Sequence, residues 1–370
     1  MKIALVGGGT GGHFYPLIAV AESLREQYPG IELFYFGPHP YNGEELARLN
    51  INFVPCPAGK VRRYFALENF IDIFRTIGGI FTAWYKLFVI YPDVVFSKGG
   101  YTSVPILLMA RFYRIPVVIH ESDSKPGRAS NLAKKFARYI GIAYASAATY
   151  FPPEKTALVG IPIRKSVQVP HQNPHEFLGV PKNRPIIFVT GGSLGAIRIN
   201  NFILNSLLQL LPHYTVFHQT GPTEEKVVIQ TSQALVSDKS LLEHYFVKGT
   251  MDAETMSALF EAASLIITRA GSTTLFEIAL HGTPAIVIPI PEEISHDQRS
   301  NAYAYARSGA ATVMEEGNLT PYLLTSEIEA IMKDPVRYET MSKAARTFAT
   351  PHAAAQIASV LIGIGQEHGS

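Results

Sequence analysis

Residues 2–27 read KIALVGGGTGGHFYPLIAVAESLREQ. The apolar run at residues 2–6 predicts a β-strand, and the glycines after it predict a tight turn. The segment from about Pro16 to Gln27 predicts an amphipathic helix with a proline near its first turn. A strand, a glycine turn and a helix in this order are typical of the first unit of a nucleotide-binding α/β domain.

The same alternation continues along the chain. Short apolar runs at residues 31–36, 94–96 and 116–119 predict further strands, with helical stretches between them. Because these runs are apolar on both faces, they favour a parallel sheet that helices cover on both sides.

The pattern starts again after residue 160. Strands predicted at residues 185–190 and 265–268 each lead into a glycine turn and a helix, and one more strand is predicted at 285–289. We therefore predict an α/β fold of two doubly wound, Rossmann-like parallel-sheet domains, residues 1–160 and 161–344. A C-terminal helix at about residues 345–370 is expected to pack back on the first domain. Ligands bind beyond the carboxyl ends of such strands, so a central cleft is the expected site.

The composition is that of a folded protein. Hydrophobic residues make up 47% of the 370 residues and charged residues 17%, which excludes a disordered chain. The single cysteine, Cys56, excludes a disulfide framework and suits a reducing compartment. The first apolar run is too short for a signal peptide. No membrane-spanning helix is expected, because Asp72, Arg75 and Lys86 interrupt the most apolar region, residues 70–91.

Charge is unevenly distributed. Residues 1–160 hold 17 Lys and Arg against 11 Asp and Glu, and residues 161–370 hold 15 against 19, so the formal charges are +6 and −4. A basic half beside an acidic half indicates that the first half faces something anionic. Chance asymmetry is the alternative.

The first glycine turn matches G-x-G-x-x-G at Gly7, Gly9 and Gly12. A dinucleotide fold also needs an acidic residue at the end of the second strand, where this chain has Phe-Gly-Pro-His at residues 36–39. A nicotinamide cofactor is therefore disfavoured. His13 follows the turn directly and is placed to act as a base or a hydrogen-bond donor. A histidine that only caps the helix is the alternative.

The second turn spans residues 191–196. It places the Ser193 hydroxyl and nearby N–H groups where they could meet phosphate oxygens. A βα turn without a ligand explains the same residues equally well.

The third turn is the most informative, and residues 269–274 read RAGSTT. A glycine at 271 is expected to permit a sharp turn and Ser272 to cap the helix. The N–H groups of Thr273, Thr274 and Leu275 would then point out of the helix start toward a phosphate. Glu277 lies on the same face one turn further on, where its carboxylate would reach the ribose of the same nucleotide. A capping box formed by Thr274 and Glu277 is the alternative.

No two aspartates stand two positions apart anywhere in the chain. The Asp-x-Asp metal clamp of metal-dependent sugar transferases is therefore missing, and we expect neither a metal nor another cofactor. The helix dipole, Arg164 and N–H groups are expected to neutralise a leaving diphosphate instead.

Between residues 67 and 88, apolar side chains recur at helical spacing on two lines. These are Leu67, Phe70, Ile71, Phe74, Ile77, Phe81, Trp84 and Phe88, and then Ile73, Ile80 and Leu87. The narrow polar stripe that remains comprises Asp72, Arg75, Gly79, Thr82 and Lys86. With Lys60, Arg62 and Arg63 beside it, this segment is expected to dip in part into an anionic bilayer. A helix buried on both sides is the alternative.

Taken in order, these motifs resemble glycosyltransferase family 28. Within it they resemble the bacterial enzymes that add N-acetylglucosamine to undecaprenyl-pyrophosphoryl-N-acetylmuramoyl-pentapeptide. The matching segments cover nearly the whole chain: residues 8–13 (GGTGGH), 92–95 (PDVV), 99–101 (GGY), 120–121 (HE), 160–164 (GIPIR), 191–196 (GGSLGA), 269–272 (RAGS), 298 (Q) and 301–302 (NA).

The resemblance implies a GT-B fold with the acceptor in the N-terminal domain and UDP-N-acetylglucosamine in the C-terminal one. It implies inversion at the anomeric carbon without a metal. It also implies a peripheral protein on the cytoplasmic face of the cell membrane. Its partners would be the UDP-sugar, a lipid-linked acceptor and the anionic membrane surface, with no nucleic acid.

The resemblance also implies roles for single residues. Thr10, Gly11 and Gly12 would contact the acceptor diphosphate or the sugar, and Gln298 would contact the sugar hydroxyls. Met251 would contact the uracil. The residues that would hold UDP are Arg164, Ser193, Ser272, Thr273, Thr274, Leu275, Phe276 and Glu277, with Glu277 on the ribose. For the general base, His13 leads, with Glu121 and Asp123 as rivals.

Two positions depart from the family pattern. After His120-Glu121 the family usually has Gln-Asn, where this chain has Ser122-Asp123. Before Gln298 it usually has Gln or His, where this chain has Asp297. Asp123 could accept a hydrogen bond from the sugar, but it adds a negative charge near phosphates. A transferase for another sugar or acceptor, and a UDP-N-acetylglucosamine epimerase or hydrolase, therefore stay open.

Overall fold

The computed structural model describes residues 1–60, 67–192, 196–292 and 296–368. The chain forms two compact units. Unit 1 comprises Met1–Lys165 and Thr350–Ser370, and unit 2 comprises Ser166–Ala349. These boundaries lie five residues from the positions expected from the sequence.

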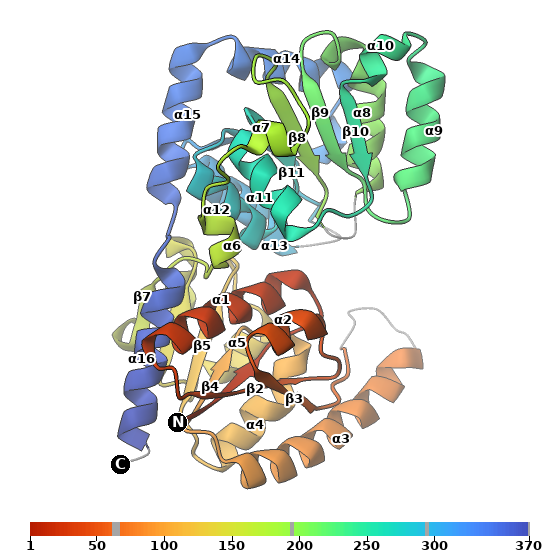
Figure 1. The fold of residues 1–370 in the computed structure, drawn as a ribbon. Coiled ribbons are helices and arrows are strands. Elements are labelled where there is room, and N and C mark those ends of the chain that lie inside the picture. Colours follow the sequence, from red (N-terminus) through yellow and green to blue (C-terminus); the bar gives the residue numbers. More distant parts are fainter. Residues whose placement is uncertain (61–66, 193–195, 293–295, 369–370) are drawn as a thin grey trace. The chain divides into compact units, whose positions relative to one another are not determined.

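Unit 1 is built on a seven-stranded parallel sheet with the order β3-β2-β1-β4-β5-β6-β7 (Figure 1). Its strands are β1 (Lys2–Val6), β2 (Glu32–Gly37), β3 (Ile51–Pro55), β4 (Val94–Ser97), β5 (Val117–Glu121), β6 (Tyr139–Ile142) and β7 (Thr156–Leu158). Its α-helices are α1 (Gly11–Gln27), α2 (Gly43–Arg48), α3 (Leu67–Ile90), α4 (Val104–Phe112), α5 (Arg128–Ala133) and α16 (Ala353–His368). Short 3₁₀ helices are η1 (Tyr101–Ser103), η2 (Ala145–Tyr150) and η3 (Pro153–Lys155).

Two apolar cores lie on opposite faces of this sheet. One core joins α1, α2 and α16 through side chains such as Leu17, Leu46 and Leu361. The other joins α3, α4 and α5 through side chains such as Leu87 and Leu107. Helix α16 therefore packs on α1, within the unit that holds the N-terminus.

Unit 2 is built on a six-stranded parallel sheet with the order β10-β9-β8-β11-β12-β13. Its strands are β8 (Ile186–Thr190), β9 (Thr215–Gln219), β10 (Tyr245–Lys248), β11 (Leu265–Thr268), β12 (Ala285–Val287) and β13 (Ala311–Val313). Its longer helices are α8 (Ile197–Leu210), α9 (Glu225–Leu235), α11 (Ala253–Ala262), α12 (Ser272–His281), α13 (His296–Ala306), α14 (Pro321–Met332) and α15 (Pro335–Phe348). Shorter ones are α6 (Lys165–Gln168), α7 (Pro174–Phe177), α10 (Lys239–Leu242) and η4 (Glu316–Asn318).

Both sheets have the same strand order relative to their first strand. In each, the first strand (β1 or β8) pairs with the second on one side and the fourth (β4 or β11) on the other. The strand order reverses at this place, and ligands of open parallel sheets bind beyond the carboxyl ends there. The predicted fold of two doubly wound parallel-sheet domains is confirmed.

Helix α1 is longer than the sequence predicts. It begins at Gly11 rather than near Pro16, and Pro16 lies inside it. The backbone of Gly11 and Gly12 is helical, although glycine is a weak helix former. The glycine turn is therefore shorter, and His13 lies in the first turn of the helix.

Helix α3 buries a narrow line of mostly small side chains and exposes most of its bulky apolar ones. The buried line comprises Asp72, Gly79, Ala83 and Leu87. Asp72 forms an ion pair with Arg75 at 3.0 Å. A Cβ on Gly79 would lie 1.9 Å from the carbonyl oxygen of Pro57, so only glycine permits this approach. The alternative of a helix buried on both sides is wrong for the described residues.

The outward side of α3 is a large apolar surface. Its exposed side chains are Phe70, Ile71, Ile73, Phe74, Ile77, Phe81, Trp84, Tyr85, Phe88 and Val89, and Phe112 of α4 is exposed too. By length and composition, Phe70–Ile90 passes the test for a spanning helix, as does Pro335–His368, which is interrupted between α15 and α16. Length and composition alone do not make either segment a membrane span, so the expectation that the chain has no spanning helix stays a prediction.

Cys56 lies beneath α3. Its side chain is buried, and its Sγ lies 3.5 Å from the carbonyl oxygen of Gly79. Burial raises the pKa of the thiol to about 12.

Candidate active site

The carboxyl edge of the unit 1 sheet brings the first glycine turn against the turn that follows β4. The N–H of Lys98 donates to the carbonyl of Val6 at 2.8 Å. A Cβ on Gly7 would lie only 2.9 Å from the Cβ of Lys98. Gly99 and Gly100 have φ angles of +82° and +80°, a conformation that favours glycine. Glycines on both turns therefore allow the two to pack together.

His13 lies beside these glycines. Its Nδ1 is 2.9 Å from Oγ1 of Thr10, the residue at the cap position of α1. A Cβ on Gly100 would lie 3.7 Å from His13 Nε2. Burial and the charge of Lys98 lower the pKa of His13 to about 4, whereas Asp123 acts to raise it. The imidazole is therefore uncharged at neutral pH, and Thr10, not His13, is the helix cap.

Lys98 is a buried cation whose role was not predicted from the sequence. Its Nζ lies 2.6 Å from Nδ1 of His120 and also donates to the Ser122 hydroxyl. Nε2 of His120 lies 2.6 Å from the carbonyl oxygen of Gly160. With an ammonium at Nδ1 and a carbonyl at Nε2, His120 is the neutral tautomer with its proton on Nε2. Burial, together with Lys98, holds the pKa of His120 well below its usual range.

The pKa of Lys98 itself is lowered. Burial brings it to about 8, while the carboxylates of Glu121 and Asp123 act to raise it. Lys98 therefore stays mostly charged at neutral pH. Its charge lies among two histidines and two carboxylates.

Both carboxylate oxygens of Glu121 are engaged in its own loop. Oε1 accepts from the N–H of Asp123 and Oε2 from the N–H of Gly127, each at 3.0 Å. Burial and Asp123 raise the pKa of Glu121, while a hydrogen bond from Ser130 acts to lower it. Glu121 therefore shapes the loop after β5. This geometry favours His13 over Glu121 as the base.

Tyrosines surround the start of α1. A Cβ on Gly11 would lie 3.1 Å from the Tyr41 hydroxyl and 3.2 Å from the Tyr15 ring. The guanidinium carbon of Arg164 lies 3.9 Å from the centre of the Tyr15 ring. Arg164 therefore belongs to unit 1, stacked next to the first turn, while Gly12 is exposed.

The third turn differs in detail from its prediction. The cap of α12 is Gly271, and Ser272 is the first helical residue. Gly271 has φ −68° and ψ 120°, which any residue adopts, so a sharp glycine-dependent turn is the wrong description. The N–H of Leu275 donates to the carbonyl of Gly271 at 3.1 Å and is therefore engaged within the helix. The N–H groups of Thr273 and Thr274 lie in the first turn, where a helix supplies no acceptor.

The middle of α12, from Leu275 to Ala279, is buried. Thr274 is the third helical residue rather than a cap, so the capping-box alternative is wrong. Glu277 is buried one turn inside the helix. The Phe276 ring packs on Phe348 of α15, with ring centres 4.7 Å apart. Phe276 is therefore a core residue.

Arg269 fixes this turn from below. Its NH2 forms an ion pair of 2.5 Å with the buried Glu316. Its NH1 donates to the carbonyls of Ile288 and Pro289, at 3.0 and 3.2 Å. Arg269 therefore ties the turn after β11 to the loop after β12. Arg269 belongs to a motif of the family resemblance, but this role was not predicted from the sequence.

The other predicted donor residues lie along the same edge of the unit 2 sheet. Gln298 of α13 accepts from the N–H of Ile290 at 3.5 Å, in the loop after β12. Met251 lies between β10 and α11, at the carboxyl end of the edge strand. Ser193 lies outside the described residues. On the second turn, the Thr190 hydroxyl donates to Gln219 at 2.7 Å and accepts from the N–H of Gly192.

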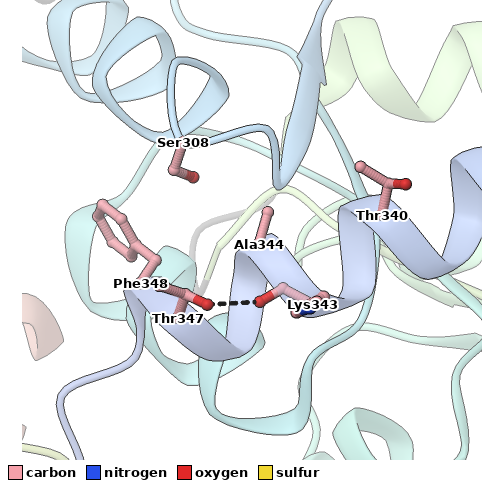
Figure 2. A pocket seen from close by; sticks show the side chains of 6 residues that line it. All are labelled: Ser308, Thr340, Lys343, Ala344, Thr347 and Phe348. Atoms are coloured by element: carbon pink, nitrogen blue, oxygen red, sulfur yellow. Dashed lines mark hydrogen bonds between the residues drawn. The ribbon is translucent and has the colours of Figure 1, made fainter.

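Two cavities lie away from these turns. One, of about 670 Å³, is lined by Ser308, Thr340, Lys343, Ala344, Thr347 and Phe348 (Figure 2). In Figure 2 the Thr347 hydroxyl bonds to the Lys343 carbonyl of the same helix, α15. The other, of about 240 Å³, lies between α16 and strands β6 and β7. Neither is lined by a predicted site residue.

Comparison with known proteins places the chain in a family. A model of the glycosyltransferase family 28 N-terminal domain matches residues 3–142, and a model of the family 28 C-terminal domain matches residues 186–357. The chain belongs to glycosyltransferase family 28. The predicted family and the predicted enzyme class are therefore confirmed.

Family 28 relatives match along almost the full chain. One is the UDP-N-acetylglucosamine--N-acetylmuramyl-(pentapeptide) pyrophosphoryl-undecaprenol N-acetylglucosamine transferase 2 of Bacillus cereus. It is 32% identical over 92% of this chain and 94% of the relative. The Staphylococcus aureus transferase of the same name, without the number, is 33% identical over 91% of this chain and 92% of its own length.

Solved structures agree with this assignment. MurG of Acinetobacter baumannii has a TM-score of 0.73 and 25% identity, covering 98% of this chain and 99% of that one. A UDP-GlcNAc 2-epimerase from Neisseria meningitidis has a TM-score of 0.71 over 98% of this chain and 100% of its own. Its identity is 15%, so it shows the fold alone. The family 28 chain therefore has the predicted GT-B fold.

Proposed function

We propose that this family 28 chain transfers N-acetylglucosamine from UDP-N-acetylglucosamine to undecaprenyl-pyrophosphoryl-N-acetylmuramoyl-pentapeptide, a step of peptidoglycan synthesis. One observation carries the proposal. The named relatives share 32–33% identity across more than nine tenths of the chain, so the match covers the candidate sites of both units.

Unit 2 supplies the donor site in this proposal. The N–H groups of Thr273 and Thr274 and the positive end of the α12 dipole bind the diphosphate, because this helix start lies at the switch point of the sheet. Glu277 bonds to the ribose, Gln298 to the sugar, and the backbone near Met251 to the uracil. Ser193 completes the diphosphate site of unit 2. Arg164 lies in unit 1, and its contact with UDP stays a prediction.

Unit 1 supplies the acceptor site. Thr10, Gly11 and Gly12 at the start of α1 contact the acceptor, again at a switch point. The acceptor hydroxyl attacks the anomeric carbon, and its proton passes to Nε2 of His13, which faces Gly100. The bond to UDP breaks as the new glycosidic bond forms, so the anomeric configuration inverts.

The low pKa of His13 fits this role only in part. A pKa of about 4 keeps the imidazole ready to accept a proton, but such a base is weak. The diphosphate of the acceptor brings negative charge next to His13, and a nearby negative charge raises a histidine pKa. Binding of the acceptor therefore strengthens the base at the moment when it is needed.

The apolar side of α3 supports a peripheral position on the cytoplasmic face of the membrane. Contiguous exposed apolar surfaces of this kind mark sites of membrane or protein interaction. Lys60 and Arg75 are exposed on or near α3, and unit 1 contains the basic half of the chain. An apolar helix side flanked by cations suits an interface with anionic lipid.

The test is an assay with a soluble analogue of the lipid-linked acceptor and UDP-N-acetylglucosamine, with and without a metal chelator. The expected product carries β-linked N-acetylglucosamine, and chelation leaves the rate unchanged. A second arm omits the acceptor. Release of UDP or a change of sugar in that arm, with no transfer in the first, would overturn the proposal in favour of an epimerase or hydrolase.

A further inference from the structure

The buried Lys98 has no part in the transfer chemistry proposed above, yet it lies at the centre of the unit 1 site. Its side chain is 2% exposed and follows β4 directly. Its backbone bonds to Val6, at the end of β1, and its ammonium group bonds to His120 and Ser122 of the next strand and its loop. One residue therefore connects the carboxyl ends of three adjacent strands, through its backbone to β1 and through its side chain to β5.

Burial of an ammonium group is costly unless opposite charges and acceptors surround it. Here the acceptors are His120 Nδ1 and the Ser122 hydroxyl, and the opposite charges are Glu121 and Asp123. Glu121 is committed to N–H groups of its own loop. Both carboxylates therefore offset the charge of Lys98, Glu121 more than Asp123, and Asp123 is the one that also acts on His13.

We propose that Lys98 is a positioning residue of the transfer reaction, which holds the Ser122-Asp123 loop against the first glycine turn and offsets the charge of Asp123. This inference rests on the proposed function. Two of the three residues that depart from the family pattern thereby share a structural reason. Ser122 accepts a hydrogen bond from this buried cation, and Asp123 is one of the two carboxylates that offset its charge.

Lys98 also acts on His13 through its charge. The charged or titratable groups that face Lys98 and His13 are His120, Glu121 and Asp123, from β5 and its loop. Of these, Asp123 raises the pKa of His13, whereas Lys98 lowers it. Removal of the Lys98 charge leaves the Asp123 effect unopposed, so the pKa of His13 rises. A base with a raised pKa becomes protonated, and so inactive, at a higher pH.

The experiment compares Lys98→Met with the wild type over a range of pH. We expect the low-pH limb of the kcat profile to move upward by about 1 pH unit, because one nearby charge has this effect on a buried group. NMR titration of His13, assigned by its loss in His13→Ala, should show the same upward shift. Lys155→Met, at the amino end of edge strand β7, removes a hydrogen-bonded lysine elsewhere in unit 1 and should leave the limb in place.

A double-mutant cycle tests the pairing with Asp123. Lys98→Met alone should lower kcat by about tenfold or more, and Asp123→Asn in that background should restore part of the loss, because the two charges are coupled. If Lys98→Met does not fold, Ser122→Ala removes one of its hydrogen bonds and should shift the limb in the same direction by less.

Each outcome is decisive. A lower kcat with an unmoved low-pH limb, or losses in the double variant that simply add, would reduce Lys98 to a structural residue and overturn the inference. An inactive wild type would instead contradict the proposed function. In that case an NMR pKa of His13 that does not change in Lys98→Met would overturn this inference separately.

Discussion

His13 and Glu277 occupy comparable places in the two units, and their surroundings differ. His13 lies in the first turn of α1, half-buried, next to glycines that leave room on one side. Glu277 lies one turn further into α12 and is buried. A side chain in the first turn faces the ligand at the strand ends, whereas one a turn deeper approaches the ligand only from its side. Proton transfer therefore fits His13, and recognition of a ribose fits Glu277.

His13→Ala is expected to lower kcat by about 100-fold or more, the usual range for loss of a general base. The Kd for UDP-N-acetylglucosamine should stay unchanged, because the proposed donor site lies in unit 2 and His13 in unit 1. The measurement is steady-state kinetics with a soluble acceptor, together with calorimetry for the donor. Full kcat in this variant would show that another group takes the proton.

For single residues, local features could be predicted from the sequence, whereas contacts between distant residues could not. The glycine turns and His13 could be predicted because the turn and the start of the helix are local features. The contact between Lys98 and His120 could not, because it joins residues 22 positions apart through the register of two strands. The adjacent Gly99-Gly100 pair was the available signal. The role given to Gly271 failed because its backbone turned out to be extended, which no single glycine reveals.

At the scale of elements, α3 shows that an apolar pattern alone does not say which side is buried. Apolar residues lie nearly all around this helix, so its periodicity left both orientations possible. The line with Gly79 and Ala83 is the buried one, because small residues let the chain near Pro57 approach closely. The bulky side chains were left outside. The proposed membrane contact and the internal packing therefore use different residues of one helix.

We expect the double variant Phe74→Glu and Phe81→Glu to lose at least about tenfold in affinity for vesicles containing anionic lipid. The two rings are 59% and 68% exposed, so the core is little affected, while burial of each ring in lipid contributes about 2 kcal/mol. Vesicle sedimentation measures the effect. Val336→Glu, at an exposed apolar position of unit 2, is the matched control. Equal vesicle binding by both variants would contradict the role of α3.

At the scale of the whole molecule, the two sheets share one topology, but different side chains lie at their carboxyl edges. The strand orders of the two sheets correspond, and each has a glycine-containing turn at its switch point. Around the unit 1 turns lie a histidine, tyrosines and a buried lysine, whereas the unit 2 turn is fixed by an arginine–glutamate pair. The fold class could be predicted because the alternation of strands and helices repeats. The predicted roles of the two units came from the resemblance to family 28 rather than from the glycine spacing, since the first turn looks more like a nucleotide site than the third.

Binding of UDP should therefore protect unit 2 and leave the first turn unaffected. Hydrogen exchange measured by mass spectrometry is expected to slow at residues 249–255, 269–277 and 288–298 when UDP is added. Exchange at residues 7–13 should stay the same. Binding to the folded protein suppresses local opening, so the effect grows with ligand concentration. Protection at residues 7–13 alone would mean that the nucleotide binds unit 1, and would contradict our proposal.

The buried thiol of Cys56 has a practical consequence. It is the only cysteine of the chain, and its pKa of about 12 leaves almost no reactive thiolate at neutral pH. Cys56 is therefore not expected to react with maleimide reagents while α3 stays in place. A cysteine introduced on the surface of each unit would take a fluorescent label without competition, so the distance between the units could be followed during turnover. Slow labelling of Cys56 itself would report the moments when α3 lifts from the sheet.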